Sequence, residues 1–220
     1  MKFILEDTIY SYFILYYMYV YLRLTHVSSL FQPAEIRAIT RLDGQGIQGN
    51  ITFTQLPDGK VHVVGSIFGL PAGHYGFHVH EKGDITGGCL STGSHFNPEH
   101  KDHGHPNDEN RHVGDLGNVS FGEDRYAQID FVDGKISLFG PHCIMGRAVV
   151  LHEKADDFGR SDHPDSRKTG NAGGRVACGV IGLLVYLQEK EINLNMTDHA
   201  IYLYLPIHLE ISYHVSSLDK

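Results

Sequence analysis

The chain has 220 residues, with 18 basic and 26 acidic side chains and a formal net charge of −8 at pH 7. This length can bury one hydrophobic core and also carry extensions. The acidic balance argues against a nucleic acid as partner. With 25 glycines and short runs of Val, Ile, Phe and Thr, the composition indicates a mostly β protein with long loops.

The N-terminal segment differs from the rest of the chain. Residues 9–22 are uncharged and largely apolar, and Arg23 and the small-residue segment Val27-Ser28-Ser29 follow. We interpret residues 1–29 as a secretory signal peptide or signal anchor, although the apolar stretch is short for a bilayer span. The alternative is a leader that never reaches a membrane. We therefore expect an extracellular protein, with a cytoplasmic location as the alternative.

The middle of the chain consists of short alternating runs separated by turn signals. Ile51 and Phe53 alternate with threonines, and Pro57-Asp58-Gly59 precedes a second alternating run, so these two runs are predicted to form a hairpin. The predicted strands cover residues 34–42, 49–56, 60–70, 76–81, 112–121, 125–132, 135–140, 146–152 and 175–181.

Two segments, 83–111 and 153–174, have no strand pattern and are rich in Gly, Asn, Asp and Ser. Loops of this length in a compact domain are usually functional or disordered.

Residues 183–220 contain no glycine and no uncharged stretch long enough to cross a membrane. We interpret them as an atypical C-terminal tail, forming either one extra strand or an irregular appendage, after a domain at residues 30–182.

Histidines are concentrated in and beside the first of these loops. His78 and His80 should share one face of a strand, because side chains two residues apart point the same way. The ordered set continues with His95, His103, His112, Asp115 and His152. Imidazole suits copper and zinc, and one carboxylate beside three imidazoles suits zinc. A single histidine among the 16 is more often a surface or core residue, so a metal site is inferred only from the whole set.

Five sequence blocks occur in order: GFHVHEKGD (76–84), GSHFNPEHKDHG (93–104), RHVGDLGNV (111–119), GRAVVLHEKADDFG (146–159) and KTGNAGGRVACGVIG (168–182). In these blocks, residues 34–182 resemble the copper/zinc superoxide dismutases. The resemblance implies an all-β fold, an eight-stranded antiparallel Greek-key barrel or sandwich with two long functional loops. It also implies an enzyme that converts superoxide to oxygen and hydrogen peroxide.

The resemblance also assigns roles to individual residues. It gives copper (Cu²⁺/Cu⁺) the ligands His78, His80, His95 and His152, and it gives zinc (Zn²⁺) the ligands His95, His103, His112 and Asp115. Asp156 matches the carboxylate that joins a copper histidine to a zinc histidine. Arg175 matches the arginine that docks the anion, and Lys168 and Thr169 match residues that steer it. The shared ligand His95 and Arg175 are therefore the expected catalytic residues.

The three cysteines, Cys89, Cys143 and Cys178, permit one disulfide and leave one thiol. The resemblance pairs Cys89 with Cys178 and leaves Cys143 unpaired. This disulfide is also found in cytosolic members of the family, so it does not decide the compartment.

Two alternatives to an enzyme remain open, namely a catalytically inactive metal-binding relative and a copper chaperone with a dismutase-like domain. Such a chaperone needs an N-terminal Met-x-Cys-x-x-Cys motif, and no cysteine precedes Cys89. We expect a homodimer, and a copper chaperone is a candidate partner for metal loading. Glycosylation triplets begin at Asn50, Asn118 and Asn195, and the first of them favours secretion.

Overall fold

The computed structural model of the chain describes Tyr17 and residues 35–184. Most of the expected signal segment, residues 1–29, and the tail beyond Leu184 lie outside the described residues. The described strands are β1 (Arg37–Gly44), β2 (Ile47–Gln55), β3 (Val61–Phe68), β4 (Gly73–His80), β5 (Asp115–Phe121), β6 (Tyr126–Asp133), β7 (Ala148–His152), β8 (Arg175–Val180) and β9 (Gly182–Leu184). Two short helices interrupt the long loops: η1 (Gly88–Thr92) and α2 (Ser166–Thr169).

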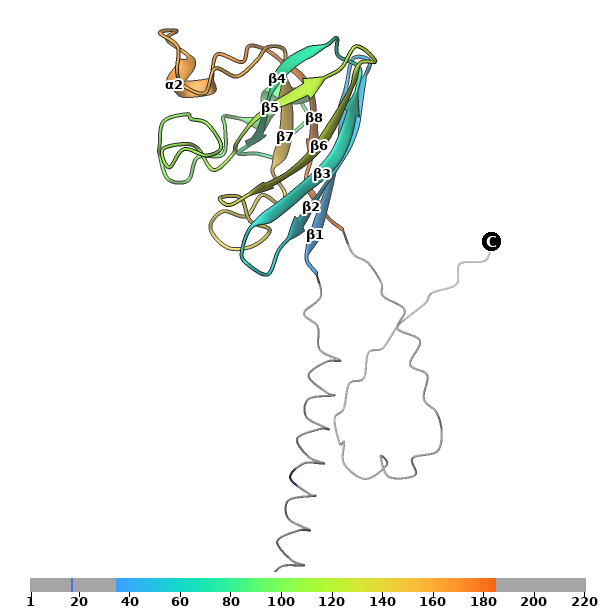
Figure 1. The fold of residues 1–220 in the computed structure, drawn as a ribbon, viewed down its shortest axis with the longest axis vertical. Coiled ribbons are helices and arrows are strands. Elements are labelled where there is room, and N and C mark those ends of the chain that lie inside the picture. The colour runs from blue at the N-terminus through green and yellow to red at the C-terminus, as the bar shows by residue number, and fades with distance from the viewer. Residues whose placement is uncertain (1–16, 18–34, 185–220) are drawn as a thin grey trace, which may run out of the picture. The chain divides into compact units, whose positions relative to one another are not determined.

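The strands form one antiparallel sheet that curves into a nearly closed barrel (Figure 1). Along the sheet the order is β5-β4-β7-β8-β1-β2-β3-β6, and the two end strands β5 and β6 pack against each other. Pairings such as β3 with β6 and β4 with β7 skip strands in sequence, which is the Greek-key pattern. The expected all-β barrel of eight strands is confirmed, and the short strand β9 adds Leu183 and Leu184 to the sheet beside β1.

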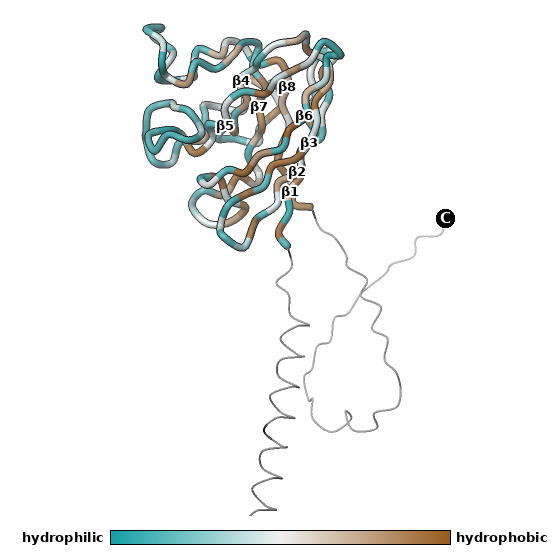
Figure 2. Tube along the Cα trace, viewed as in Figure 1, coloured by the Kyte–Doolittle hydropathy of each residue, from teal (hydrophilic) through white to brown (hydrophobic). Residues whose placement is uncertain are grey.

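Alternating apolar residues build the core. In β2, Ile51 and Phe53 are fully buried, and in β3 the same is true of Val61 and Val63. The predicted hairpin is confirmed, since β2 and β3 are antiparallel neighbours. Figure 2 shows hydrophobic colours along the strands and mostly hydrophilic colours along the two long loops.

The predicted strand at residues 135–140 is wrong. This segment makes one isolated β-bridge, and side chains satisfy several of its backbone N–H groups in place of a neighbouring strand. Asp133 Oδ1 accepts the N–H groups of Lys135 at 2.8 Å and Ile136 at 2.9 Å, and Gln55 Oε1 accepts the N–H of Leu138 at 2.8 Å. Side chains that bond to the local backbone compete with ladder formation in this way.

The two long loops lie on the same side of the barrel, alongside β4, β5 and β7 (Figure 1). The first loop is fastened to the end of β6 by Arg111, which is fully buried and lies 2.7 Å from Asp133 Oδ2. A rigid barrel that presents long loops at one side is a common way to position functional side chains. Among the described residues, no helix is long and apolar enough to cross a membrane.

Candidate metal centre

Two neighbouring strands, β4 and β7, supply the first group of histidines. His78 and His80 lie on β4, while the intervening Val79 and the preceding Phe77 belong to the hydrophobic core. His152 ends β7, and β7 is hydrogen-bonded to β4 through pairs that include His80 with Ala148. The alternation of a strand therefore turns both β4 histidines away from the core and toward the loops.

The first loop returns His95 to this position. An isolated antiparallel bridge joins His80 to His95, and the N–H of Phe96 donates to the carbonyl oxygen of Val79 at 2.8 Å. The ligand atoms of His78, His80, His95 and His152 all lie within 4.8 Å of one another, and all four side chains are buried. The structure thus brings the four expected copper ligands together.

The hydrogen bonds of His80 and His152 indicate which ring nitrogens are free to bind a cation. His80 Nδ1 lies 2.9 Å from the carbonyl oxygen of Gly93, and His152 Nδ1 lies 3.2 Å from that of Gly173. Because a carbonyl oxygen only accepts, each Nδ1 must carry the proton, and in a neutral ring Nε2 then holds a lone pair. The two Nε2 atoms are 3.4 Å apart, so two lone pairs face each other, an arrangement that a shared cation stabilises.

The remaining two nitrogens of this group are also unpartnered. His78 Nδ1 and His95 Nε2 are buried and accept no hydrogen bond from the described residues. A buried polar atom without a partner costs about 1–3 kcal/mol, and such atoms are rare in native structures. Four imidazole nitrogens with free lone pairs therefore point into one small space, which fits copper.

A second group surrounds one oxygen of Asp115, at the start of β5. The Nδ1 atoms of His95, His103 and His112 lie 3.0, 2.9 and 3.1 Å from Asp115 Oδ1. Three imidazole nitrogens and one carboxylate oxygen make the ligand set of a tetrahedral zinc site. His95 belongs to both groups, with Nδ1 in this one and Nε2 in the other.

One assignment in the second group has two candidates. The ligand atoms of His78, His95, His103 and Asp115 also lie within 4.8 Å of one another, so His78 competes with His112 for a place in this group. The direct contacts favour His112, whose Nδ1 is 3.1 Å from Asp115 Oδ1 and 3.4 Å from His95 Nδ1. His78 already belongs to the first group, and its Nε2 is engaged elsewhere, as described below.

The loop backbone fixes the Asp115 carboxylate. Its Oδ2 atom accepts the N–H of His112 at 2.8 Å and the N–H of Gly104 at 3.1 Å, so Oδ1 is left to face the imidazoles. Burial alone would raise the pKa of Asp115, but hydrogen bonds from His103, His112 and His95 outweigh it and hold the pKa far below its usual value. Asp115 therefore carries its negative charge at any physiological pH.

Asp156, in the second long loop, connects the two groups. Its Oδ2 lies 2.8 Å from His78 Nε2 and its Oδ1 lies 2.7 Å from His103 Nε2. A carboxylate bonded to the outer ring nitrogen fixes the tautomer, so that Nδ1 of each histidine faces the metal position. Gly170 packs against this contact with φ +67°, and a Cβ there would lie 1.9 Å from Asp156 Oδ1, so a glycine is required.

Burial and neighbouring charges move the histidine pKa values in opposite directions. Burial, then the nearby His95, lower the pKa of His152 to about 4. Burial also tends to lower the pKa of His103, but hydrogen bonds to Asp115 and Asp156 outweigh it and raise the pKa to about 9. The pKa values of His78, His80 and His95 are lowered, in each case mainly by burial.

We expect the metal-free protein to lose stability as the pH falls from about 7 to 5. The unfolded chain protonates His152 near pH 6.5, whereas the folded chain resists protonation until about pH 4, so acid favours unfolding. His152 alone should account for about 2 kcal/mol at pH 5, and the other histidines with lowered pKa values add to this loss. Urea unfolding of the chelator-treated chain at several pH values measures this.

His103 should act with the opposite sign and over a different range. Its raised pKa gives stability that is fully present below about pH 6.5 and is lost as the pH rises through about 9. The metal-free chain should thus be most stable near neutral pH. An unfolding free energy that stays constant or rises between pH 7 and 5 would contradict these assignments.

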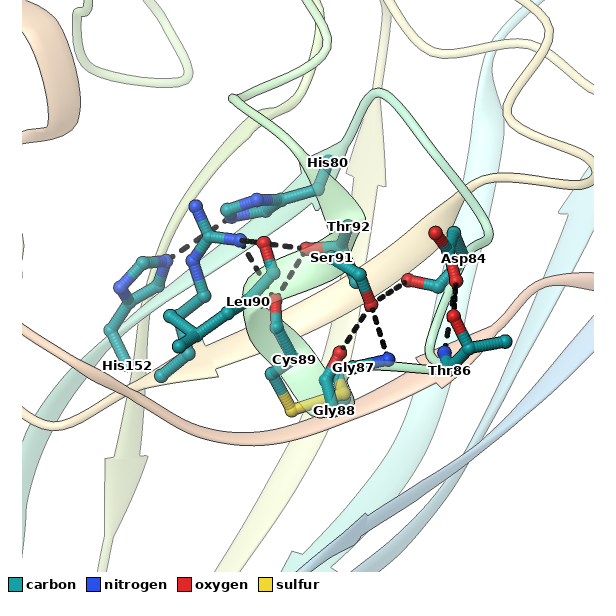
Figure 3. The surroundings of a disulfide bond; sticks show 12 residues. His80, Asp84, Thr86, Gly87, Gly88, Cys89, Leu90, Ser91, Thr92 and His152 are labelled. Atoms are coloured by element: carbon teal, nitrogen blue, oxygen red, sulfur yellow. Dashed lines mark hydrogen bonds between the residues drawn. A yellow bond between two sulfur atoms is a disulfide. The ribbon is translucent and has the colours of Figure 1, made fainter.

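Arg175 and the disulfide lie beside the first group. Arg175 is paired with His152 across β7 and β8, and its guanidinium donates to the carbonyl oxygens of Cys89 at 2.8 Å and Gly93 at 2.7 Å. Cys89, in η1, is bonded to Cys178 in β8 with a Cα–Cα distance of 5.6 Å. Figure 3 shows the rings of His80 and His152 next to η1.

The remaining predicted residues lie at the periphery. Lys168 and Thr169 are exposed on α2, outside both ligand groups. Cys143 is an unpaired, half-buried cysteine whose Sγ donates to the carbonyl oxygen of Leu138 at 3.2 Å. Sequence reasoning missed the carbonyl acceptors of Gly93 and Gly173, because only the fold brings these backbone groups to the rings.

Comparisons with known proteins agree with this geometry. The family model described as copper/zinc superoxide dismutase (SODC) matches residues 47–181. A crystal structure of "the clock protein EA4" is similar, with a TM-score of 0.68 and 76% sequence identity. That alignment covers 70% of this chain and 98% of the other chain.

Proposed function

Because this chain belongs to the copper/zinc superoxide dismutase family, we propose that residues 30–182 form an active dismutase that converts two superoxide anions and two protons to oxygen and hydrogen peroxide. The observation that carries the proposal is the position of His95, whose two ring nitrogens belong to two different ligand groups. A structural zinc site alone would need only one of them. Both groups are buried, as a preorganised centre requires.

The proposed copper ligands are His78, His80, His95 and His152, and the proposed zinc ligands are His95, His103, His112 and Asp115. Bound copper would supply one-electron redox chemistry between Cu²⁺ and Cu⁺, while zinc is redox-inert and holds its ligands in place. Asp156 keeps the outer nitrogens of His78 and His103 protonated and thereby directs their lone pairs inward.

The protein must also deliver protons, because peroxide leaves as a neutral molecule. His95 Nε2 is buried and has no hydrogen-bond partner among the described residues. We propose that this nitrogen holds one of the two protons when its lone pair is not shared with copper, and passes it to the second anion, while solvent supplies the other proton. Asp115 Oδ1, 3.0 Å from Nδ1, keeps the ring in place.

A chain of net charge −8 needs a local positive potential to attract an anion. Arg175 would supply it at the centre, since its guanidinium is held by Cys89, Thr92 and Gly93 close to His80 and His152. Lys168, exposed on α2, would extend this potential outward, with Thr169 beside it.

Replacing Arg175 with alanine should lower kcat/KM for superoxide by about 10-fold or more, because local electrostatic attraction raises capture of a charged substrate by roughly 10–10³-fold. The measurement compares variant and wild-type protein at matched copper and zinc content. Arg175→Lys should recover part of the rate, since it restores the charge without the planar fork. An unchanged rate at low salt would remove Arg175 from the proposed site.

Metal analysis of the full-length chain, combined with a dismutation assay, tests the proposed function. One copper and one zinc per chain together with activity would support it. Zinc alone without activity would support the alternative of an inactive metal-binding or chaperone-like relative.

A second candidate function comes from the 76% identical protein, which is described as a clock protein. A role in timekeeping that does not depend on dismutation would explain a chain that takes up both metals yet removes superoxide no faster than the metal-free chain does. The same preparation therefore discriminates between the two candidates.

We further propose a secreted homodimer, with a copper chaperone as a partner in metal loading. Val180 and Leu183 are exposed next to Gly182, and an exposed apolar strip of this kind suits a subunit contact. The disulfide is compatible with an extracellular location, and Asn50 is exposed. Sedimentation of the full chain and N-terminal sequencing of protein from the medium test these two points.

A further inference from the structure

Asn118 makes an unusual contact with the second long loop. It lies on β5 opposite Gly76 and is partly buried. Its side-chain Nδ2 donates to the carbonyl oxygen of Asp156 at 2.9 Å, and its Oδ1 accepts the N–H of Asp156 at 2.8 Å. One amide side chain thus satisfies both backbone groups of a residue 38 positions away.

The residue held in this way is the one that joins the two ligand groups. The carboxylate of Asp156 is fully buried and bonds to His78 Nε2 and His103 Nε2. Asp156 belongs to none of the described strands, because it lies in the loop that joins β7 to β8. Nearby, the N–H of Gly76 donates to the carbonyl oxygen of Lys154 at 2.8 Å, so β4 and β5 together locate this part of the loop.

The same strand also carries Asp115. Between the two residues, Gly117 has φ +85°, which breaks the regular alternation of β5. Asp115 therefore faces the three imidazoles directly, while Asn118 faces the loop backbone. A single strand thus locates the carboxylate of the zinc group and the carboxylate that bridges to the copper group.

We propose that Asn118 is a positioning residue that aims the Asp156 carboxylate, and through it the rings of His78 and His103. This inference deepens the proposed function and rests on it for the identity of the ions. Aspartate at this position would lack the donor for the Asp156 carbonyl oxygen, and alanine would lack both groups. Only an amide of this length supplies a donor and an acceptor at the required separation.

The assignment also bears on the glycosylation triplet that begins at Asn118. The Nδ2 atom that a glycan would occupy is the donor to Asp156, so the folded protein should carry no glycan there. The triplet at Asn50 differs, because its side chain is exposed on β2.

A double-mutant cycle on the full-length chain tests the proposal. Zinc affinity is measured by chelator competition for wild type, Asn118→Ala, Asp156→Ala and the double variant. We expect Asn118→Ala to weaken zinc binding by about 10-fold. Loss of a direct hydrogen-bond partner of a metal ligand typically weakens metal binding 10–100-fold, and Asn118 acts through such a partner, so its effect should fall at the lower end of that range. In the Asp156→Ala background the same change should have almost no further effect.

A second measurement follows the two rings themselves. In the zinc- and Cu⁺-loaded protein, which is diamagnetic, the Nε2–H protons of His78 and His103 should be visible by NMR and protected from exchange by Asp156. Asn118→Ala and Asn118→Asp should both speed the exchange of these two protons. Asn118→Asp keeps the acceptor and removes only the donor, so it remains informative if the alanine variant folds poorly.

Gln55→Ala is the matched control. Gln55 is also an amide side chain that ties a loop to the barrel, because it accepts the N–H of Leu138 and donates to the carbonyl oxygens of Gly59 and Lys60. Gln55→Ala should lower stability without changing zinc affinity or the exchange rate of the two ring protons.

The proposal would be overturned if Asn118→Ala weakened zinc binding equally in the wild-type and Asp156→Ala backgrounds. It would also be overturned if the exchange of the two ring protons were unchanged. Asn118 would then serve strand stability alone. A wild-type chain that binds both metals without dismutation would instead refute the proposed function and leave this inference standing.

Discussion

Replacing His95 with alanine is expected to abolish dismutation and to weaken the binding of both metals at once. The two ring nitrogens of His95 lie in different ligand groups, so one substitution removes a ligand from each. We expect zinc affinity to fall at least ~100-fold, because mutation of a residue that merely hydrogen-bonds to a metal ligand already lowers metal affinity 10–100-fold. Chelator competition for each metal, with a dismutation assay, measures the result.

Three variants provide the comparison. His80→Ala should weaken copper binding and largely spare zinc, whereas His112→Ala should do the reverse, because each ring reaches only one group. His62→Ala should change neither, since His62 pairs with Asp130 on the outer face of β3 and β6. Normal affinity for either metal in His95→Ala would show that the ring does not join the two sites.

Removing the disulfide by Cys178→Ser is expected to lower the free energy of unfolding by roughly 4–5 kcal/mol in the metal-free chain. The bond joins residues 89 positions apart, and its loss restores the conformational entropy of that loop to the unfolded state. It also frees η1, where the Cys89 carbonyl oxygen accepts from Arg175 at 2.8 Å, so activity should fall as well. Urea denaturation without reductant measures the stability.

Cys143→Ser is the matched control for this change. Cys143 is half-buried and unpaired, and its Sγ makes one weak hydrogen bond to Leu138. Cys143→Ser should lower the free energy of unfolding by well under half as much as Cys178→Ser does. If both serine variants unfold at the same urea concentration as the wild type, the disulfide contributes little to stability.

Local sequence patterns predicted those parts of the structure that depend on local rules. Alternation and the Pro57-Asp58-Gly59 turn predicted the β2–β3 hairpin, and spacing on a strand predicted that His78 and His80 share a face. The same reasoning wrongly predicted a strand at residues 135–140, where the side chains of Asp133 and Gln55 accept backbone N–H groups in place of a neighbouring strand. Such side-chain competition cannot be read from alternation.

Family resemblance predicted what local patterns could not. The positions of Asp156 and of the Cys89–Cys178 pair follow from long-range packing, and no spacing rule indicates either of them. From the sequence, Asn118 was singled out only as the first residue of a glycosylation triplet. Its contact with Asp156 exists because β5 and the second loop meet in the folded chain.

The contacts between the two long loops have a consequence for dynamics. Besides the Asp156 link to His103, the N–H of His103 donates to the carbonyl oxygen of Arg167, and Arg160 pairs with Asp108. Segments connected in this way open as one cooperative unit rather than separately. Loss of zinc from the first loop should therefore also release the second, so that amide hydrogen exchange accelerates across the segment that carries Lys168.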